Sequence, residues 1–124
     1  MDINVQLMDN KIMEFKKFVD EFAKMFEQGH LSVNMWKTQH GQLRAMNEAW
    51  IAKNKLEEEK LSSVISAGEK IKFDDVSAHE KAKADIVVLH AKAYAKYKEF
   101  ERFLDEADKR RLKASLKELE AVAA

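Results

Sequence analysis

Proline is absent from all 124 residues, and glycine occurs only three times. Inside a helix, proline costs about 3 kcal/mol and glycine about 1 kcal/mol relative to alanine, so few positions in this chain favour a helix end. Gly29 and Gly68 divide the sequence into three long stretches rich in helix-forming residues. The pattern predicts an all-α protein: an elongated antiparallel bundle of three long helices with coiled-coil-like packing, the last helix being continuous or split into two.

The first helix is predicted over residues 2–28 and the second over residues 32–67, with Ser32 as the N-cap and Gly29 and Gly68 just past the two C-terminal ends. Apolar residues of the first helix recur at alternating spacings of four and three, which is a heptad seam: Met8, Ile12, Phe15, Val19, Phe22 and Phe26. The seam of the second helix is interrupted by polar residues on or near its line: His40, Asn47, Asn54 and Glu57.

The third stretch begins with a heptad seam and then changes phase. The seam runs through Ile86, Leu89 or His90, Ala93, Tyr97, Phe100, Leu104 and Ala107. Leu112, Leu116 and Leu119 follow a different line, and a phase change indicates a stutter, a kink or a new helix. We therefore predict helices over residues 75–107 and 109–122, with a break within residues 105–111. An unbroken helix would be about 70 Å long, against about 50 Å for the second, and would project beyond it.

Length and composition indicate a single helical domain over residues 1–124. Basic and acidic residues number 22 each, and a net charge of zero argues against a surface adapted as a whole to nucleic acid or to an anionic membrane. The absence of cysteine excludes disulfides, cysteine-based zinc sites and thiol nucleophiles. Neither a secretory signal nor a membrane-spanning stretch is visible, so we expect a cytoplasmic protein.

Catalytic and metal-binding patterns are missing from the sequence. A di-metal helical bundle needs two Glu-x-x-His motifs, whereas only Glu27-x-x-His30 fits, and Gly29 interrupts it. The serines lack the sequence context of a nucleophile elbow, and His90 is expected to be a hydrogen-bonded, partly buried residue. We expect no enzyme activity, no cofactor and no metal.

Methionine and aromatic residues are concentrated in the first part of the chain. All six methionines lie within residues 1–46, and four of the seven phenylalanines and both tryptophans lie within residues 1–50. Such side chains either fill the core or form adaptable contacts with a partner. Phe18 and Met25 widen the apolar stripe of the first helix beyond its seam. The main hypothesis is a non-enzymatic protein–protein interaction module, such as an adaptor, a chaperone or a stoichiometric inhibitor, with Phe18, Met25, Met35 and Trp36 as its anchors.

Charge in the third stretch occurs in alternating blocks. Residues 81–98 carry five lysines and one aspartate, residues 99–108 carry five acids and one arginine, and residues 109–117 carry five basic residues. These bands either pair antiparallel with a second copy or an oppositely banded partner, or form a solvated face with local ion pairs. The first reading supports an alternative function, a self-assembling structural subunit of a viral particle or a secretion apparatus.

A basic cluster in the last block consists of Lys109, Arg110, Arg111 and Lys113. Such a cluster can bind phosphates in a sequence-independent, salt-dependent way, which leaves a nucleic-acid-associated accessory protein as a third alternative. The acidic residues just before it, and the lack of a zinc finger or a glycine-rich phosphate loop, argue against this alternative.

Overall fold

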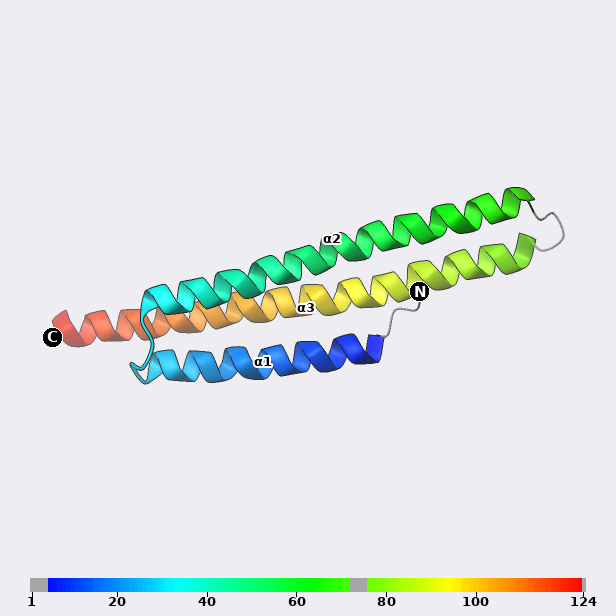
Figure 1. Ribbon diagram of the computed structural model, residues 1–124. Coiled ribbons are helices and arrows are strands. Elements are labelled where there is room, and N and C mark those ends of the chain that lie inside the picture. The colour runs from blue at the N-terminus through cyan, green and yellow to red at the C-terminus, as the bar shows by residue number, and fades with distance from the viewer. Residues whose placement is uncertain (1–4, 72–75, 124) are drawn as a thin grey trace.

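The computed structural model describes residues 5–71 and 76–123, which form three helices: α1 (Val5–Glu27), α2 (Val33–Ile71) and α3 (Val76–Ala123). The helices lie side by side in an up-down-up order, with α3 running along both of the others (Figure 1). No strand occurs within these ranges, and the predicted all-α, elongated antiparallel bundle is confirmed. The predicted helix start at residue 2 and the connection at residues 72–75 lie outside the described residues.

The connection between α1 and α2 forms as the sequence predicts. Gly29 has a φ of 76°, a conformation that costs glycine little. The N–H groups of Gly29 and His30 donate to the carbonyls of Phe26 and Met25 at 3.0 and 2.9 Å, which is the Schellman pattern of a helix C-terminus. Ser32 then caps α2, because its Oγ accepts a hydrogen bond of 3.1 Å from the N–H of Met35.

Two predicted helix ends are wrong. The second helix continues through Gly68 to Ile71, and the third has no break within residues 105–111. One glycine costs a helix only about 1 kcal/mol, which is too little to end it. In α3 the core-facing line continues from Ala107 to Arg111, whose side chain is 11% exposed, and to partly buried Ala114. The change of phase therefore marks a second apolar line on the outside of one continuous helix.

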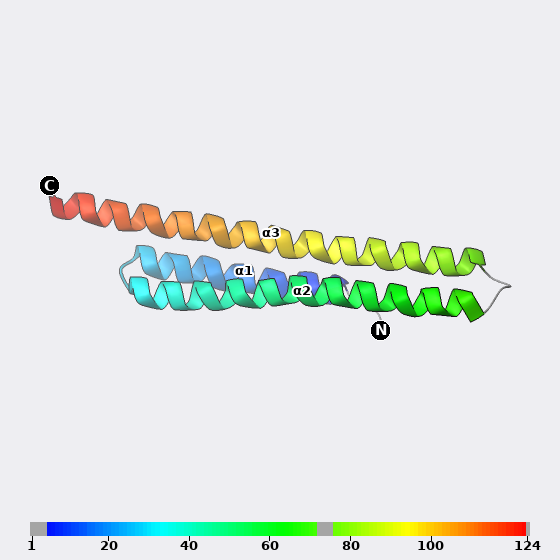
Figure 2. The same cartoon turned by 90° about the horizontal axis from the view of Figure 1, so that it is seen from above.

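Helix α3 is the central element of the bundle. Both α1 and α2 pack mainly on α3 and touch each other over only a short stretch. In Figure 2, α3 lies along one edge, with α1 and α2 on the same side of it. One long face of α3 is therefore turned away from the other two helices.

The molecule has three sections along its length. In the middle, α1 lies beside the part of α3 between Lys96, which pairs with Asp9, and Arg110, which pairs with Glu27. Beyond the start of α1, α2 and α3 are the two described segments that continue, as a two-helix arm that we define as residues 55–71 and 76–89. At the other end, the C-terminal end of α3 projects past both helices (Figure 1). We define residues 112–123 as the α3 tail, whose first turns still border the α1–α2 connection.

The hydrophobic core lies within the three-helix section. Its α3 residues continue the predicted heptad seam, and aromatic side chains from α1 and α2 fill the space between those two helices. Heptad spacing brings these side chains together because both α1 and α2 present their seams to the same stretch of α3. Among the described residues, the buried apolar ones are Ile12, Val19, Ala23, Phe26, Leu31, Trp36, Ala93, Tyr97, Phe100, Leu104 and Ala107.

Polar residues on the seam of α2 bind the backbone of α3 at regular intervals. Nε2 of His40 donates to the carbonyl of Leu104 at 2.8 Å, and the side-chain amides of Asn47 and Asn54 donate to the carbonyls of Tyr97 and His90 at 3.0 Å each. Donors and acceptors are both seven residues apart, so the same contact recurs once per heptad. These bonds fix how far α2 is shifted along α3, as buried polar residues do in coiled coils.

Candidate protein-binding surface

Trp36 is one of the four predicted anchors, but it belongs to the core. Its side chain is only 1% exposed and lies between the rings of Phe22 and His40. Its indole N–H donates to the carboxylate of Asp108 at 3.0 Å. Burial raises the pKa of Asp108, but the hydrogen bonds from Trp36 and Arg111 outweigh it, and the net pKa shift is downward. The sequence could not distinguish Trp36 from an exposed anchor, because its neighbours come from α1 and α3.

The other three predicted anchors are exposed on two neighbouring helices. Phe18 and Met25 of α1 are 44% and 43% exposed, and Met35 of α2 is 56% exposed. Phe18 stacks on Phe22 with ring centroids 5.6 Å apart, and Phe22 stacks on Trp36 at 5.8 Å. A continuous series of rings therefore connects this surface to the core.

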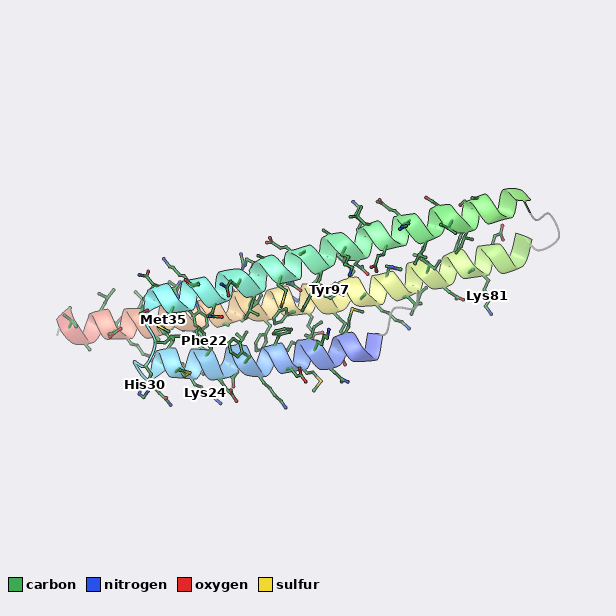
Figure 3. All side chains as sticks on the ribbon, viewed as in Figure 1. Phe22, Lys24, His30, Met35, Lys81 and Tyr97 are labelled. Atoms are coloured by element: carbon green, nitrogen blue, oxygen red, sulfur yellow. The ribbon has the colours of Figure 1, made fainter. Side chains whose placement is uncertain are left out.

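A shallow hollow of about 250 Å³ lies between α1 and α2, lined by Phe22, Asn34, Met35, Thr38 and Gln39. Phe22 and Met35 are labelled in Figure 3, near the end of the molecule that holds the α1–α2 connection. We define the α1–α2 face as Phe18, Phe22, Met25, Met35 and Gln39. It combines four large apolar side chains with one uncharged polar residue, Gln39, a composition typical of protein contacts.

The two edges of the α1–α2 face differ in charge. On α2 the polar residues that line the hollow are uncharged. On α1, Glu14 and Glu21 are exposed, and they lie four residues before and three residues after Phe18. These spacings put both carboxylates beside Phe18 on the helix surface. Exposed Lys17 lies between them, three residues after Glu14 and four before Glu21. The face is therefore uncharged along α2 and bordered by charges of both signs along α1.

The predicted basic cluster is largely neutralised within the chain. Arg110 donates to Asp20 at 2.8 Å and to Glu27 at 2.9 Å, joining the C-terminal half of α1 to α3. Hydrogen bonds from Arg110 are the largest cause of the lowered pKa of both carboxyls. Lys109 pairs with Glu106 at 3.1 Å, and Arg111 with Asp108 at 3.0 Å.

Lys113 is the remaining member of the basic cluster. It lines a hollow of about 520 Å³ between the α1–α2 connection and the α3 tail, beside Arg110 and Lys117. Glu27 and Glu118 line the same hollow, so it is mixed in charge. This setting favours intramolecular pairing over a basic patch for phosphates.

The charge bands of α3 also pair with the other helices of the same chain. Lys96 meets Asp9 at 3.2 Å and Glu99 meets Lys16 at 2.8 Å, while Asp105 pairs with Arg44 of α2. Four charged residues of α1 lie at spacings of 7, 4 and 7 beside its seam: Asp9, Lys16, Asp20 and Glu27. Charges that flank a heptad seam determine which helix packs beside it. The spacing of these four residues could therefore have predicted the interhelical ion pairs from the sequence.

The outward face of α3 carries apolar residues that the sequence interpretation recognised only in part. Leu112, Leu116 and Leu119 are exposed, as are Val87 and Tyr94, which were not singled out. Their spacing could have indicated this second apolar line from the sequence. Val87 and Tyr94 are seven residues apart, and Leu112 and Leu119 repeat the same interval.

Within the described ranges, no group of three or more potential metal-ligating side chains comes together. His90 is fully buried, and its Nδ1 donates to the carbonyl of Ile86 at 2.8 Å, while its buried Nε2 has no hydrogen-bond partner among the described residues. No helix in the described part of the chain combines the length and the apolar character needed to cross a membrane.

Comparison with known protein families, with curated protein sequences and with solved structures gave no significant match.

Proposed function

We propose that this protein is a non-enzymatic protein–protein interaction module whose α1–α2 face receives a helix of a partner protein. One observation carries the proposal. Phe18, Met25 and Met35 are exposed together on two helices, above rings that continue into the core. Rigidly supported aromatic residues and adaptable methionines are typical of binding surfaces.

The shape and charge of the face define the partner. A helix that lies in a groove presents apolar residues at positions i, i+3 or i+4, and i+7. Glu14, Lys17 and Glu21 border the face on the α1 side, so the partner helix should carry charged residues of both signs along that edge. An adaptor, a chaperone and a stoichiometric inhibitor could each use such a contact.

The test has two steps. A photo-reactive phenylalanine analogue at position 35 would identify the partner in cells of the source organism, with the same analogue at exposed Val64 of the arm as the background control. Binding of that partner would then be measured by calorimetry for the variant F18A/M25A/M35A. We expect a loss of at least roughly 100-fold, because removal of a contact anchor typically costs 1–2 kcal/mol or more.

Met13→Ala is the matched control, since Met13 is 53% exposed but lies outside the α1–α2 face. It should leave affinity within about threefold of the wild type, as expected outside a contact surface. Unchanged partner binding by the triple variant, with helicity and unfolding temperature preserved, would contradict the proposal.

A self-assembling structural subunit is the second candidate function, favoured by the projecting tail of α3 and its exposed Leu112, Leu116 and Leu119. It predicts large, concentration-dependent assemblies that disappear when residues 112–124 are deleted. Light scattering on the two proteins distinguishes this candidate from a module that works on a foreign partner. The intramolecular pairing of Arg110 and Arg111 leaves nucleic-acid binding without a comparable observation in its favour.

A further inference from the structure

The outward side of α3 carries a second apolar line, which we call the outer face. Its five large apolar residues, Val87, Tyr94, Leu112, Leu116 and Leu119, are 46–66% exposed. The interhelical ion pairs to α1 use Lys96, Glu99 and Arg110, which lie outside this line. Asp105 lies at the edge of the line toward α2, where it pairs with Arg44. The complete outer face consists of Ala84, Val87, Ala91, Tyr94, Lys98, Glu101, Arg102, Asp105, Lys109, Leu112, Leu116 and Leu119.

The outer face is symmetric about the peptide bond between Glu101 and Arg102. From Ala84 to Lys98 its residues follow each other at steps of 3, 4, 3 and 4, and from Asp105 to Leu119 at steps of 4, 3, 4 and 3. Two such helices laid antiparallel therefore align every position of one with a position of the other. We propose that two copies of this chain pair in this way, with the twofold axis at residues 101 and 102.

Opposite charges meet at the centre of the pair. Lys98 lies across from the partner's Asp105, and Glu101 lies across from the partner's Arg102; the symmetry repeats both pairs. Within one copy, Lys98 pairs with Glu101 at 3.0 Å and Asp105 pairs with Arg44. The dimer joins these local pairs into one network across the axis, and networks contribute more than isolated surface pairs.

Apolar residues meet on both sides of the charged centre. Val87 lies across from the partner's Leu116, while Ala91 and Ala84 lie across from the partner's Leu112 and Leu119. A small residue thus faces a large one at two of the three positions, which lets the helices approach and interdigitate. Tyr94 faces the partner's Lys109, whose cation can lie over the ring.

The same residues disfavour other alignments. Sliding the partner by one heptad puts Lys98 against the partner's Lys98 in one direction, and Asp105 against the partner's Asp105 in the other. A parallel, in-register pair creates both of these repulsions at once. Like charges placed opposite each other select one alignment by excluding the rest.

The contact is long enough for a stable dimer and leaves the α1–α2 face free. It extends over residues 84–119, about 54 Å of helix. Stable interfaces bury about 1,200–2,000 Å², which this length and five large apolar side chains per copy can supply. The outer face borders α2 at the Asp105–Arg44 pair but shares no residue with the α1–α2 face, so the dimer does not depend on the proposed partner contact.

Disulfide formation tests the pairing directly, because the chain has no cysteine of its own. Copies carrying Val87→Cys are mixed with copies carrying Leu116→Cys and oxidised. We expect a disulfide-linked dimer in the mixture and none in either protein alone, since residues 87 and 116 of one chain are about 43 Å apart along α3. A linked dimer in one protein alone, or none in the mixture, would overturn the pairing.

Molar mass provides a test that needs no engineered cysteine. Light scattering of the wild type should approach twice 14.4 kDa as concentration rises. Leu116→Lys should raise the dissociation constant by at least roughly 100-fold, since each dimer loses two buried leucines. Val64→Lys is the matched control, exposed to a similar extent on α2, and should leave the dimer intact. A wild type that remains monomeric at all concentrations would overturn the inference.

Discussion

At the residue scale, the glycines show how the same residue type acts differently in different settings. Gly29 has a φ of 76° and ends α1, whereas Gly41 lies within α2 at a φ that any residue adopts. A Cβ added at either position would meet nothing within 4 Å, so only the backbone distinguishes them. The positive φ at Gly29 disfavours side chains, and the helical Gly41 has only the entropic disadvantage of glycine.

Alanine substitutions at these two positions should therefore change stability in opposite directions. Gly41→Ala should raise the free energy of unfolding by about 0.5–1 kcal/mol, and Gly29→Ala should lower it by about 1 kcal/mol. Urea denaturation followed by circular dichroism measures both. A lower free energy of unfolding for Gly41→Ala than for the wild type would mean that α2 requires glycine at position 41.

At the scale of the elements, one cation between two carboxylates joins α1 to α3. Arg110 lowers the pKa of Asp20 and Glu27 from their usual values of 3.8 and 4.5. Carboxyls with a lowered pKa in the folded state stabilise it at neutral pH, and this contribution is lost as the pH falls through the folded-state pKa. The association of α1 with α3 should therefore weaken in acid.

Arg110→Gln tests this contribution. At pH 7 the variant should be less stable than the wild type by about 1 kcal/mol, because both pairs are partly exposed. The difference should shrink as the pH falls below the usual carboxyl pKa values of 3.8 and 4.5 and the two lowered carboxyls become protonated. Lys109→Gln is the control, since its ion pair with Glu106 lies within α3. A difference that does not shrink as the pH falls would show that Arg110 acts through packing of its side-chain stem.

The polar contacts between α2 and α3 give a second prediction at this scale. The side-chain oxygen of buried Asn47 has no hydrogen-bond partner among the described residues, although its amide donates to Tyr97. Asn47→Leu should raise the free energy of unfolding by about 1 kcal/mol, since it removes this unsatisfied acceptor. Gln42→Leu, on the exposed side of α2, should change it by less than about 0.5 kcal/mol. A less stable Asn47→Leu would show that the amide bond outweighs the unsatisfied oxygen.

At the scale of the whole molecule, the three sections differ in how much each helix can bury. In the three-helix section α3 contacts two helices, whereas in the arm it contacts, among the described residues, α2 alone. Exposed apolar residues such as Leu56, Val64 and Val88 accumulate in the arm. Local stability follows buried apolar contacts, so the sections should open independently.

Hydrogen exchange measured by mass spectrometry tests this difference. Amides of residues 93–107 should exchange most slowly, and those of residues 80–89 at least about tenfold faster. The measurement should use the Leu116→Lys variant, in which the proposed dimer is weakened. A dimer formed through α3 would also slow amide exchange in the arm and hide the difference. Equal protection along the whole of α3 would mean that the helix opens as one unit.

The sequence by itself determined the local structure. Missing proline, heptad spacing, Gly29 and Ser32 specify three helices, the α1–α2 connection and the α3 seam from Ala93 to Ala107, since these features act over a few residues. Only the tertiary structure decided which apolar residues are core and which are surface. Trp36 is buried and Phe18 exposed because α1 and α2 pack on one side of α3. The tertiary structure also decided that α3 continues past residue 107 without a break. Its second apolar line faces outward, so the change of phase does not disturb the packing of the core.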